Sequence, residues 1–281
     1  MRAVALDDAG QPVLADVPEP EGPGELVRVL ACGLCGSDVE KLRPEHAGVV
    51  LGHEVVAETG DGRRVALVHH QACGECTRCR AGHEATCEIF RAPTIRPGGF
   101  AERANAQAWV ELGHGVDAAR ATAVEPLACV LRGAARVPRG RILIVGHGFI
   151  GRLFAAVLER RGDEVFAVDV DPARAGRGPD APVDAAVLCA PGGVDTALAA
   201  TAPGGTILVF ADAGAIPAGP VYRRELTLVG SRSATQGAMR EAAALLPALD
   251  LPEPTVLPLE RFAEGLSRYR SGGALKVVFV P

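Results

Sequence analysis

Hydrophobic positions in the first 115 residues come in short runs separated by turn residues. Four of these runs are 25-ELVRVLACG-33, 49-VVLGHEVVAETG-60, 63-RRVALVHH-70 and 99-GFAERANA-106. They are rich in valine and bounded by glycine or Asp-Gly, a pattern typical of short strands joined by tight turns. We therefore expect an irregular, all-β first domain.

The pattern changes after about residue 120, where apolar strand-like runs alternate with helical spacing. The run 141-RILIVG-146 precedes apolar residues at helical intervals between 148 and 161. Further strands are expected at 164–170, 183–190, 205–211, 224–231 and 274–281. Helices are expected near 193–201, 236–249 and 260–270, with a proline-rich linker at 250–260. This alternation predicts an α/β domain with a doubly wound parallel sheet.

Composition narrows the classes of function. A chain of 281 residues favours two compact domains, and a net charge of -5 without a basic block argues against a nucleic-acid partner. The N-terminus does not resemble a signal peptide, and no uncharged apolar stretch reaches the roughly 18 residues of a membrane span. We expect a cytoplasmic protein whose eight cysteines are reduced.

The strongest chemical signal is a loop of four cysteines, 73-CGECTRCRAGHEATC-87. Cys73, Cys76, Cys79 and Cys87 follow the spacing C-x2-C-x2-C-x7-C. Four closely spaced thiolates suit tetrahedral structural zinc, a closed site with no position left for substrate. Unrelated thiols or an iron–sulfur cluster are the alternatives.

A second group lies upstream of this loop. The stretch 31-ACGLCGSD-38 contains Cys32 and Cys35 at the spacing of a redox pair, and 52-GHE-54 follows. A redox pair calls for a thioredoxin-like βαβ setting, whereas the surrounding sequence predicts a β-domain turn. His53 and Glu54 with a distant cysteine form the mixed ligand set that leaves zinc open to water or substrate.

A glycine-rich turn, 146-GHGFIG-151, directly follows one predicted strand and opens a helix. Its G-x-G-x-x-G spacing permits a tight turn and close approach of backbone to a pyrophosphate, which faces the helix N-terminus. Asp169 ends the next predicted strand, where an acid binds ribose hydroxyls and repels a 2′-phosphate. NAD is thus favoured over NADP, with Asp171 as an alternative acid.

Taken in order, these segments resemble the zinc-dependent medium-chain alcohol dehydrogenase family, in a shortened form similar to its sorbitol- and threonine-dehydrogenase branch. The matching text covers nearly the whole chain: 31-ACGLCGSD-38, 51-LGHEVV-56, the 73–87 loop, 99-GFAERA-104, 125-EPLA-128, 142-ILIVGHGFIG-151, 203-PGGTILVF-210, 224-RELTLVGS-231 and 258–281. The resemblance implies a GroES-like β domain at 1–122, to which 252–281 returns, and a Rossmann domain at 123–251. It also implies two zinc ions per chain, and a homo-oligomer, dimer or tetramer, with 224–230 near the edge that pairs.

The resemblance assigns roles to individual residues. Cys35, His53 and Glu54 correspond to the ligands of the catalytic zinc, and Glu125 corresponds to the fourth position, as a ligand of zinc or of a zinc-bound water. Ser37 corresponds to the hydroxyl that takes the alcohol's proton, although it also suits a turn that caps a helix. The predicted cofactor-binding residues are Gly146, Gly148, Phe149, Ile150, Gly151 and Asp169.

The chain departs from the family pattern in three places, one of which is a shortened β connection at 58–63. Glu40 stands where many relatives have a proton-relaying histidine, so either Glu40 relays the proton, or the route differs, or turnover is slow. The stretch 171–184 replaces a helix and a strand, which predicts a trimmed Rossmann sheet.

Three functions are compatible with these features. The first is a zinc- and NAD(P)-dependent dehydrogenase that transfers a hydride between NAD(H) and a secondary alcohol or polyol, or its ketone. The second is a related reductase of an unsaturated or imine-like intermediate. The third is a zinc-stapled binding or redox-sensing protein without turnover.

Overall fold

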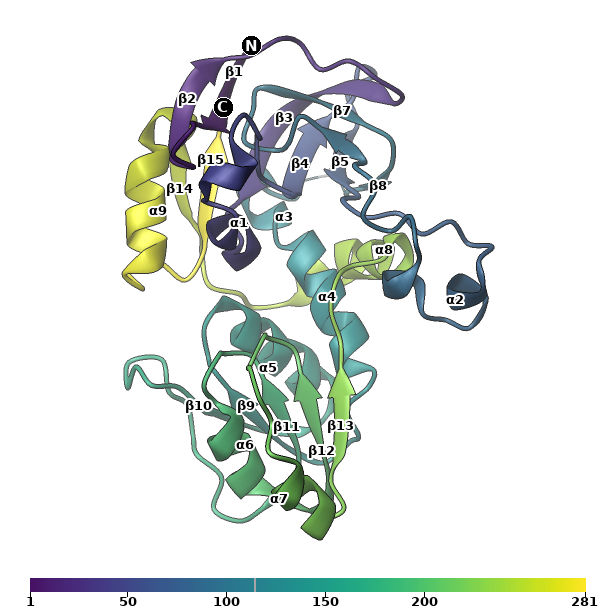
Figure 1. Ribbon diagram of the computed structural model, residues 1–281, viewed down its shortest axis with the longest axis vertical. Coiled ribbons are helices and arrows are strands. Elements are labelled where there is room, and N and C mark those ends of the chain that lie inside the picture. The colour runs from purple at the N-terminus through teal and green to yellow at the C-terminus, as the bar shows by residue number, and fades with distance from the viewer. Residues whose placement is uncertain (114) are drawn as a thin grey trace. The chain divides into compact units, whose positions relative to one another are not determined.

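The computed structural model describes residues 1–113 and 115–281, which divide into two compact units (Figure 1). The first unit comprises Met1–Ala128, Ala234–Ala248 and Pro252–Pro281, and the second comprises Cys129–Ser233 and Leu249–Leu251. These limits differ from the expected domains, because Ala234–Ala248 belongs to the first unit. Its helix α8 (Gln236–Leu245) packs on strand β8 (Trp109–Glu111), where Gln236 Nε2 donates to Trp109 O at 3.4 Å.

The described part of the first unit is built on an eight-stranded sheet and a separate hairpin. The sheet runs β14-β15-β3-β4-β5-β8, and β7 joins β3 to β6. Its further strands are β3 (Glu25–Gly33), β4 (Glu54–Glu58), β5 (Arg64–Leu67), β6 (Ile95–Arg96), β7 (Arg103–Ala106), β14 (Thr255–Pro258) and β15 (Val277–Val280). The hairpin pairs β1 (Arg2–Leu6) with β2 (Pro12–Asp16).

The C-terminal segment completes this sheet and its core. Strand β15 pairs antiparallel with β3, placing Val278 opposite Gly33 and Phe279 opposite Cys32. Rings of Phe100, Phe262 and Phe279 then meet with centroids 4.4–5.6 Å apart, in the range of stabilising aromatic pairs. Strand β15 therefore lies beside the end of β3, next to the turn that follows it.

Helices in the first unit are short. Besides α8, they are α1 (Gly36–Glu40), α2 (Thr77–Arg80), α3 (Ala118–Ala121), α9 (Phe262–Arg270) and the 3-10 turns η1 (Pro44–His46), η2 (Glu84–Thr86), η3 (Leu246–Ala248) and η4 (Leu259–Arg261). Helix α4 (Val124–Ala134) begins in the first unit and ends in the second. Among the described residues, no helix combines the length and apolar character needed to cross a membrane.

The second unit is the predicted α/β domain, with a parallel sheet in the order β10-β9-β11-β12-β13. Its strands are β9 (Arg141–Val145), β10 (Glu164–Val168), β11 (Val183–Leu188), β12 (Thr201–Val209) and β13 (Thr227–Gly230). Helix α5 (Phe149–Arg161) packs on β9 and β10, α6 (Val194–Ala200) packs on β9, β11 and β12, and α7 (Ala218–Arg223) precedes β13.

The second sheet is trimmed, as the sequence predicts. Residues 171–182 contribute neither helix nor strand, so β10 is an edge strand. Parallel strands β9 and β10 end side by side, with Val145 opposite Val168. The glycine-rich turn and Asp169 therefore leave the same edge of this sheet.

Candidate active site and metal centres

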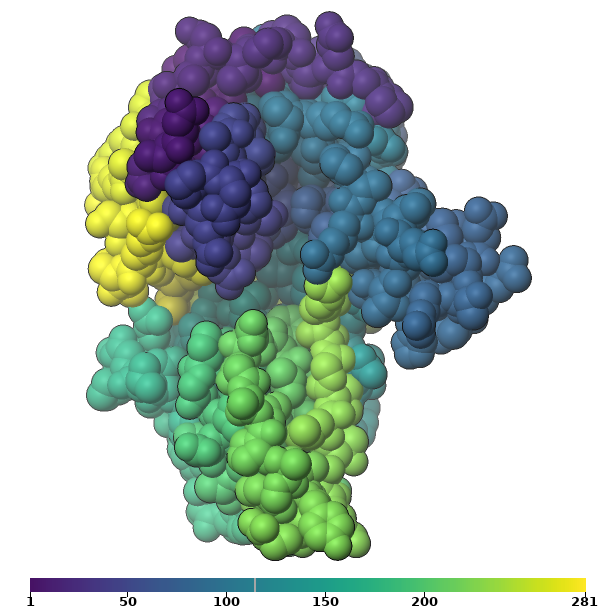
Figure 2. All heavy atoms as spheres, in the orientation of Figure 1, coloured from purple at the N-terminus to yellow at the C-terminus, as the bar shows by residue number. Residues whose placement is uncertain are grey.

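The cysteine loop, defined here as Cys73–Cys87, brings its four sulfurs into one cluster. The ligand atoms lie within 4.8 Å of one another, and three of the S···S distances are 3.5, 3.6 and 3.8 Å. A tetrahedral ion with bonds of about 2.3 Å to sulfur requires S···S separations of about 3.8 Å. The four cysteines thus fit one zinc ion. In Figure 2 the loop forms a lobe that stands out from the rest of the first unit.

Backbone groups prepare the loop for a cation. The N–H of Cys76 points to Cys73 Sγ at 3.3 Å, and the N–H of Cys73 points to Cys87 Sγ at 3.4 Å. Hydrogen bonds from the backbone of Cys76 and Glu75 lower the pKa of Cys73 to about 7. Burial, by contrast, raises the pKa of Cys79 to about 12, so the four thiols differ in how readily they form the thiolates that bind zinc.

The catalytic cluster, defined here as Cys35, His53 and Glu54, forms a second group of converging ligand atoms, again within 4.8 Å of one another. Cys35 is the N-cap of α1, whereas His53 and Glu54 enter β4. Gly52 precedes them with φ +96°, and a Cβ there would lie 2.8 Å from the Cys32 sulfur. Glycine therefore permits the turn that presents His53 to Cys35.

Asp38 connects two residues of this cluster, Cys35 and His53. Its buried carboxylate contacts His53 Nδ1 at 3.2 Å and accepts the N–H groups of Cys35 at 3.1 Å and Gly52 at 3.3 Å. Burial by itself would lower the pKa of His53, but the Asp38 carboxylate outweighs burial and raises that pKa well above 6.5. With Nδ1 engaged by Asp38, Nε2 is the nitrogen of His53 left to bind a metal.

Glu54 is paired inside the protein with Lys276. The Lys276 ammonium forms an ion pair with Glu54 and also donates to Leu34 O at 3.1 Å. Burial opposes the charge of Lys276, but Glu54 raises the pKa of the ammonium above its ordinary value.

The remaining predicted catalytic residues are placed differently. Ser37 Oγ donates to Cys35 Sγ at 3.5 Å, so the hydroxyl is next to the catalytic cluster. Glu40 lies at the end of the same short helix and is exposed. Glu125 is buried in the first turn of α4, but within the described residues it is not part of the group whose ligand atoms converge.

Cys32 is set apart from Cys35. Its side chain is 1% exposed and belongs to the hydrophobic core of the first unit. Burial, followed by the nearby carboxylates, raises the pKa of Cys32 well above its ordinary value. A buried protonated thiol is a poor partner for redox exchange, which supports the reading of Cys35 as a single ligand.

The glycine-rich turn in the second unit has the form of a dinucleotide site. Gly148 is the N-cap of α5, and space next to it is open, since an added Cβ would contact nothing within 4 Å. A Cβ on Gly151 would lie 2.1 Å from Gly146 O, so this glycine allows the helix to pack against the turn. Phe149 and Ile150 form the first turn of α5.

Asp169 is positioned by the backbone on both sides. Its carboxylate accepts the N–H of His147 at 2.7 Å and the N–H of Asp171 at 2.9 Å. It thereby joins the end of β10 to the glycine-rich turn. The alternative acid, Asp171, instead pairs with Arg174 at 3.3 Å and caps a turn through Ala173 N.

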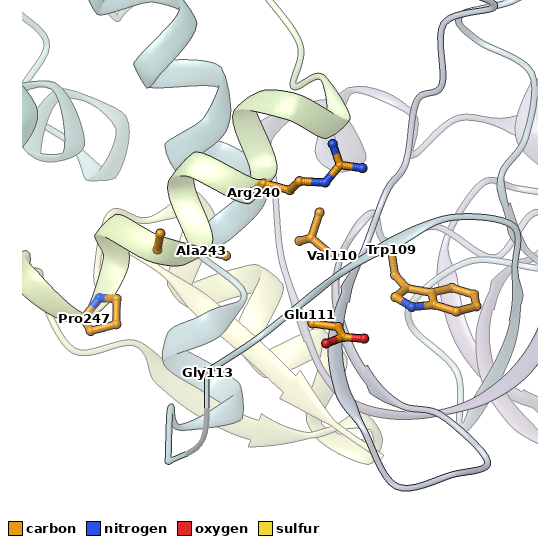
Figure 3. Close-up of a pocket in the computed structure, with 8 residues that line it drawn as sticks. Trp109, Val110, Glu111, Gly113, Arg240, Ala243 and Pro247 are labelled. Atoms are coloured by element: carbon orange, nitrogen blue, oxygen red, sulfur yellow. The ribbon is translucent and has the colours of Figure 1, made fainter.

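A pocket of about 580 Å³ lies elsewhere in the first unit, between β8 and α8 (Figure 3). Described residues that line it include Trp109, Glu111 and Arg240, but none of the predicted site residues. Glu111 is already paired with Arg63 at 2.8 Å. The pocket is therefore separate from the candidate active site.

Sequence reasoning missed two charged residues and two histidines. Neither Asp38 nor Lys276 receives a role from the sequence. His69 and His70 passed as the end of a strand, yet the His69 ring lies 4.9 Å from that of His53. An acid three residues after the ligand cysteine is the local signal that points to Asp38, whereas Lys276 has no local signal.

Comparison with known proteins places these features in context. Residues 22–112 match the model of the alcohol dehydrogenase GroES-like domain. D-altritol 5-dehydrogenase of Agrobacterium fabrum (strain C58) is 30% identical over 298 residues, covering 88% of each chain. L-galactonate-5-dehydrogenase of Escherichia coli (strain K12) is 29% identical over 178 residues, which cover 57% of this chain and only 52% of that enzyme. An alcohol dehydrogenase from Thermus sp. ATN1 has the same fold, with a TM-score of 0.85 over 100% of both chains at 24% identity.

Proposed function

Because the chain belongs to the zinc-dependent medium-chain alcohol dehydrogenase family, we propose that it transfers a hydride between NAD(H) and a secondary alcohol or polyol, or the corresponding ketone. The observation that carries this proposal is the convergence of Cys35, His53 and Glu54 within 4.8 Å. A sulfur, a nitrogen and an oxygen ligand form a set that leaves a position for substrate. The relative named for a polyol, D-altritol 5-dehydrogenase, supports the substrate class.

Two zinc ions per chain are part of the proposal. The cysteine loop would hold the structural ion, and the catalytic cluster would hold the other, with Glu125 as a ligand of the ion or of its water. A zinc ion at the catalytic cluster supplies Lewis acidity, which lowers the pKa of a bound alcohol. Asp38 would keep His53 in the tautomer that binds metal through Nε2.

Ser37 is proposed to accept the proton of the alcohol. Its hydroxyl donates to Cys35 Sγ, and a hydroxyl can also accept a hydrogen bond. Glu40, one turn further along α1, is exposed and is proposed to pass the proton to solvent in place of the usual histidine.

The second unit is proposed to bind NAD in preference to NADP. Gly146, Gly148 and Gly151 would accommodate the pyrophosphate at the N-terminus of α5, where the helix dipole favours negative charge. Asp169 would accept hydrogen bonds from the ribose hydroxyls and repel a 2′-phosphate. Comparing kcat/KM for the two cofactors tests this preference, and a higher value with NADP contradicts it.

The activity is tested by screening polyols for NADH formation, with two cysteine variants as a matched pair. Cys35→Ser removes a ligand of the catalytic cluster and is expected to reduce turnover at least a hundredfold while the protein stays folded. Cys73→Ser removes a ligand of the cysteine loop and is expected to lower the melting temperature. Full turnover by Cys35→Ser, or its unfolding in place of Cys73→Ser, would refute the assignment.

Neither of the other two functions is proposed. The named relatives are polyol and alcohol dehydrogenases, which gives no support to a reductase of unsaturated or imine-like intermediates.

A homo-oligomer, dimer or tetramer, is proposed through β13, an edge strand with Leu228 exposed. Light scattering of the purified protein measures its mass, and a monomer at micromolar concentration contradicts this assembly.

A further inference from the structure

Four aromatic rings form a continuous row between the catalytic cluster and the cysteine loop. Ring centroids are 4.9 Å apart for His53 and His69, 4.0 Å for His69 and His70, and 4.8 Å for His70 and Phe90. Each neighbouring pair is tilted by 33–42°. Aromatic rings at such separations attract one another beyond the effect of their buried area.

Each end of the row is anchored in one of the two clusters. His53 belongs to the catalytic cluster, and Phe90, 1% exposed, packs with Ala85 and Cys87 in the core of the cysteine loop. The other three cysteines of the loop pack against the same small core. His69 and His70 lie on the segment that joins β5 to Cys73, so the row also follows the chain from one cluster to the other.

His53 needs such support because one hydrogen bond cannot fix an imidazole ring. Asp38 holds the Nδ1 edge of His53, but rotation of an imidazole about its Cβ–Cγ bond has a broad energy minimum. The face of the ring is held by His69, and His69 is held in turn by His70. The ring of His70 in turn contacts that of Phe90, which completes the row.

We propose that His69, His70 and Phe90 are positioning residues through which the metal-loaded cysteine loop fixes the ring of His53. Metal in the cysteine loop then strengthens metal binding at the catalytic cluster, and by linkage the reverse also holds. The inference rests on the proposed function, because it requires that both clusters bind metal. The cysteine loop would then affect catalysis as well as the stability of the fold.

The test uses Co²⁺ as a spectroscopic probe of the catalytic cluster. The full-length protein is loaded with one equivalent of Zn²⁺, which four thiolates hold preferentially, and is then titrated with Co²⁺ while visible absorption is recorded. His70→Leu and Phe90→Leu are each expected to weaken Co²⁺ binding by roughly tenfold and to shift the absorption band, the size of effect seen when support around a ligand is lost. His70→Phe keeps a ring in the row and is expected to bind Co²⁺ as the wild type does.

Two controls separate the possible outcomes. Phe154→Leu removes a buried ring of the second unit, which pairs with Phe210 at 4.8 Å, and is expected to leave the Co²⁺ spectrum unchanged. Wild-type binding and spectrum in folded His70→Leu would overturn the inference, as would equal losses in His70→Leu and His70→Phe. Absence of any Cys35-dependent absorption in the wild type would instead overturn the proposed function, and the inference with it.

Discussion

Asp38 and Lys276 are the two buried charges on which the geometry of the catalytic cluster depends. Asp38 is 2% exposed, and its carboxylate contacts the side chain of His53 and accepts the backbone N–H of Cys35. Lys276 is 4% exposed and neutralises Glu54. Buried charges are costly unless they are paired. Removing either charge is therefore expected to change a measurable property of its partner or of the fold.

The Asp38–His53 pair predicts how metal binding depends on pH. Because Asp38 raises the pKa of His53, protonated His53 stabilises the metal-free protein fully below about pH 6.5, its ordinary pKa, and this stabilisation is lost as the pH rises through the raised value. Zinc needs the neutral ring, so zinc affinity falls with decreasing pH below that raised pKa, by up to about tenfold per pH unit.

The Asp38→Asn variant checks this account. Without the carboxylate the pKa of His53 falls, so the pH at which zinc affinity begins to decline is expected to move to lower values. Zinc competition titrations of both proteins between about pH 5 and about pH 9 provide the measurement. Superimposable pH profiles for Asp38→Asn and wild type would show that Asp38 does not set the protonation of His53.

The Glu54–Lys276 pair predicts a large loss of stability. Lys276→Met leaves the Glu54 carboxylate buried without its cation, which is expected to cost about 3–5 kcal/mol in the free energy of unfolding. Urea unfolding of the metal-free protein measures it. Arg28→Met is the control, because it breaks an exposed pair of 2.7 Å with Glu58 that contributes at most about 1 kcal/mol. Equal losses in the two variants would contradict the prediction.

At the scale of elements, periodicity and turn residues predicted most of the strands but not those that depend on distant partners. The run 25–33 is strand β3 as expected, and the glycine-rich turn opens α5 as expected. The stretch 250–260 was expected to be a linker, yet Thr255–Pro258 is strand β14. It pairs in parallel with β15 at the sheet edge, where a proline is tolerated, and no local pattern reveals that pairing.

The contact between α5 and the glycine-rich turn gives an element-scale prediction. Gly151→Ala places a Cβ against Gly146 O, and overpacking of this kind costs about 1–3 kcal/mol. We expect NADH affinity to fall at least tenfold, measured by fluorescence titration, with the metal content unchanged. Gly237→Ala in α8 is the control, because its Cβ meets open space and alanine favours the helix by up to about 1 kcal/mol. Wild-type NADH affinity in Gly151→Ala would refute this role.

At the scale of the whole molecule, the motifs predicted the two folds and most of the residues that converge. Contiguous signals were the reliable ones: the cysteine loop and the pair His53 and Glu54 are close in sequence and close in space. The segment Ala234–Ala248 was assigned to the second domain but belongs to the first unit. Its helical spacing predicts a buried face but not the sheet against which that face packs. Lys276 pairs with Glu54, which is 222 residues away in the sequence, so no local pattern indicates this pair either.

The central claim is that one chain carries two metal sites with different roles, and counting zinc tests it most directly. Mass spectrometry under native conditions is expected to find two zinc ions per wild-type chain and one in folded Cys35→Ser. The ion that remains should be lost on treatment with a thiol-modifying reagent that reaches the cysteine loop. A wild-type chain with a single zinc ion, or a Cys35→Ser chain that keeps two, would contradict the account.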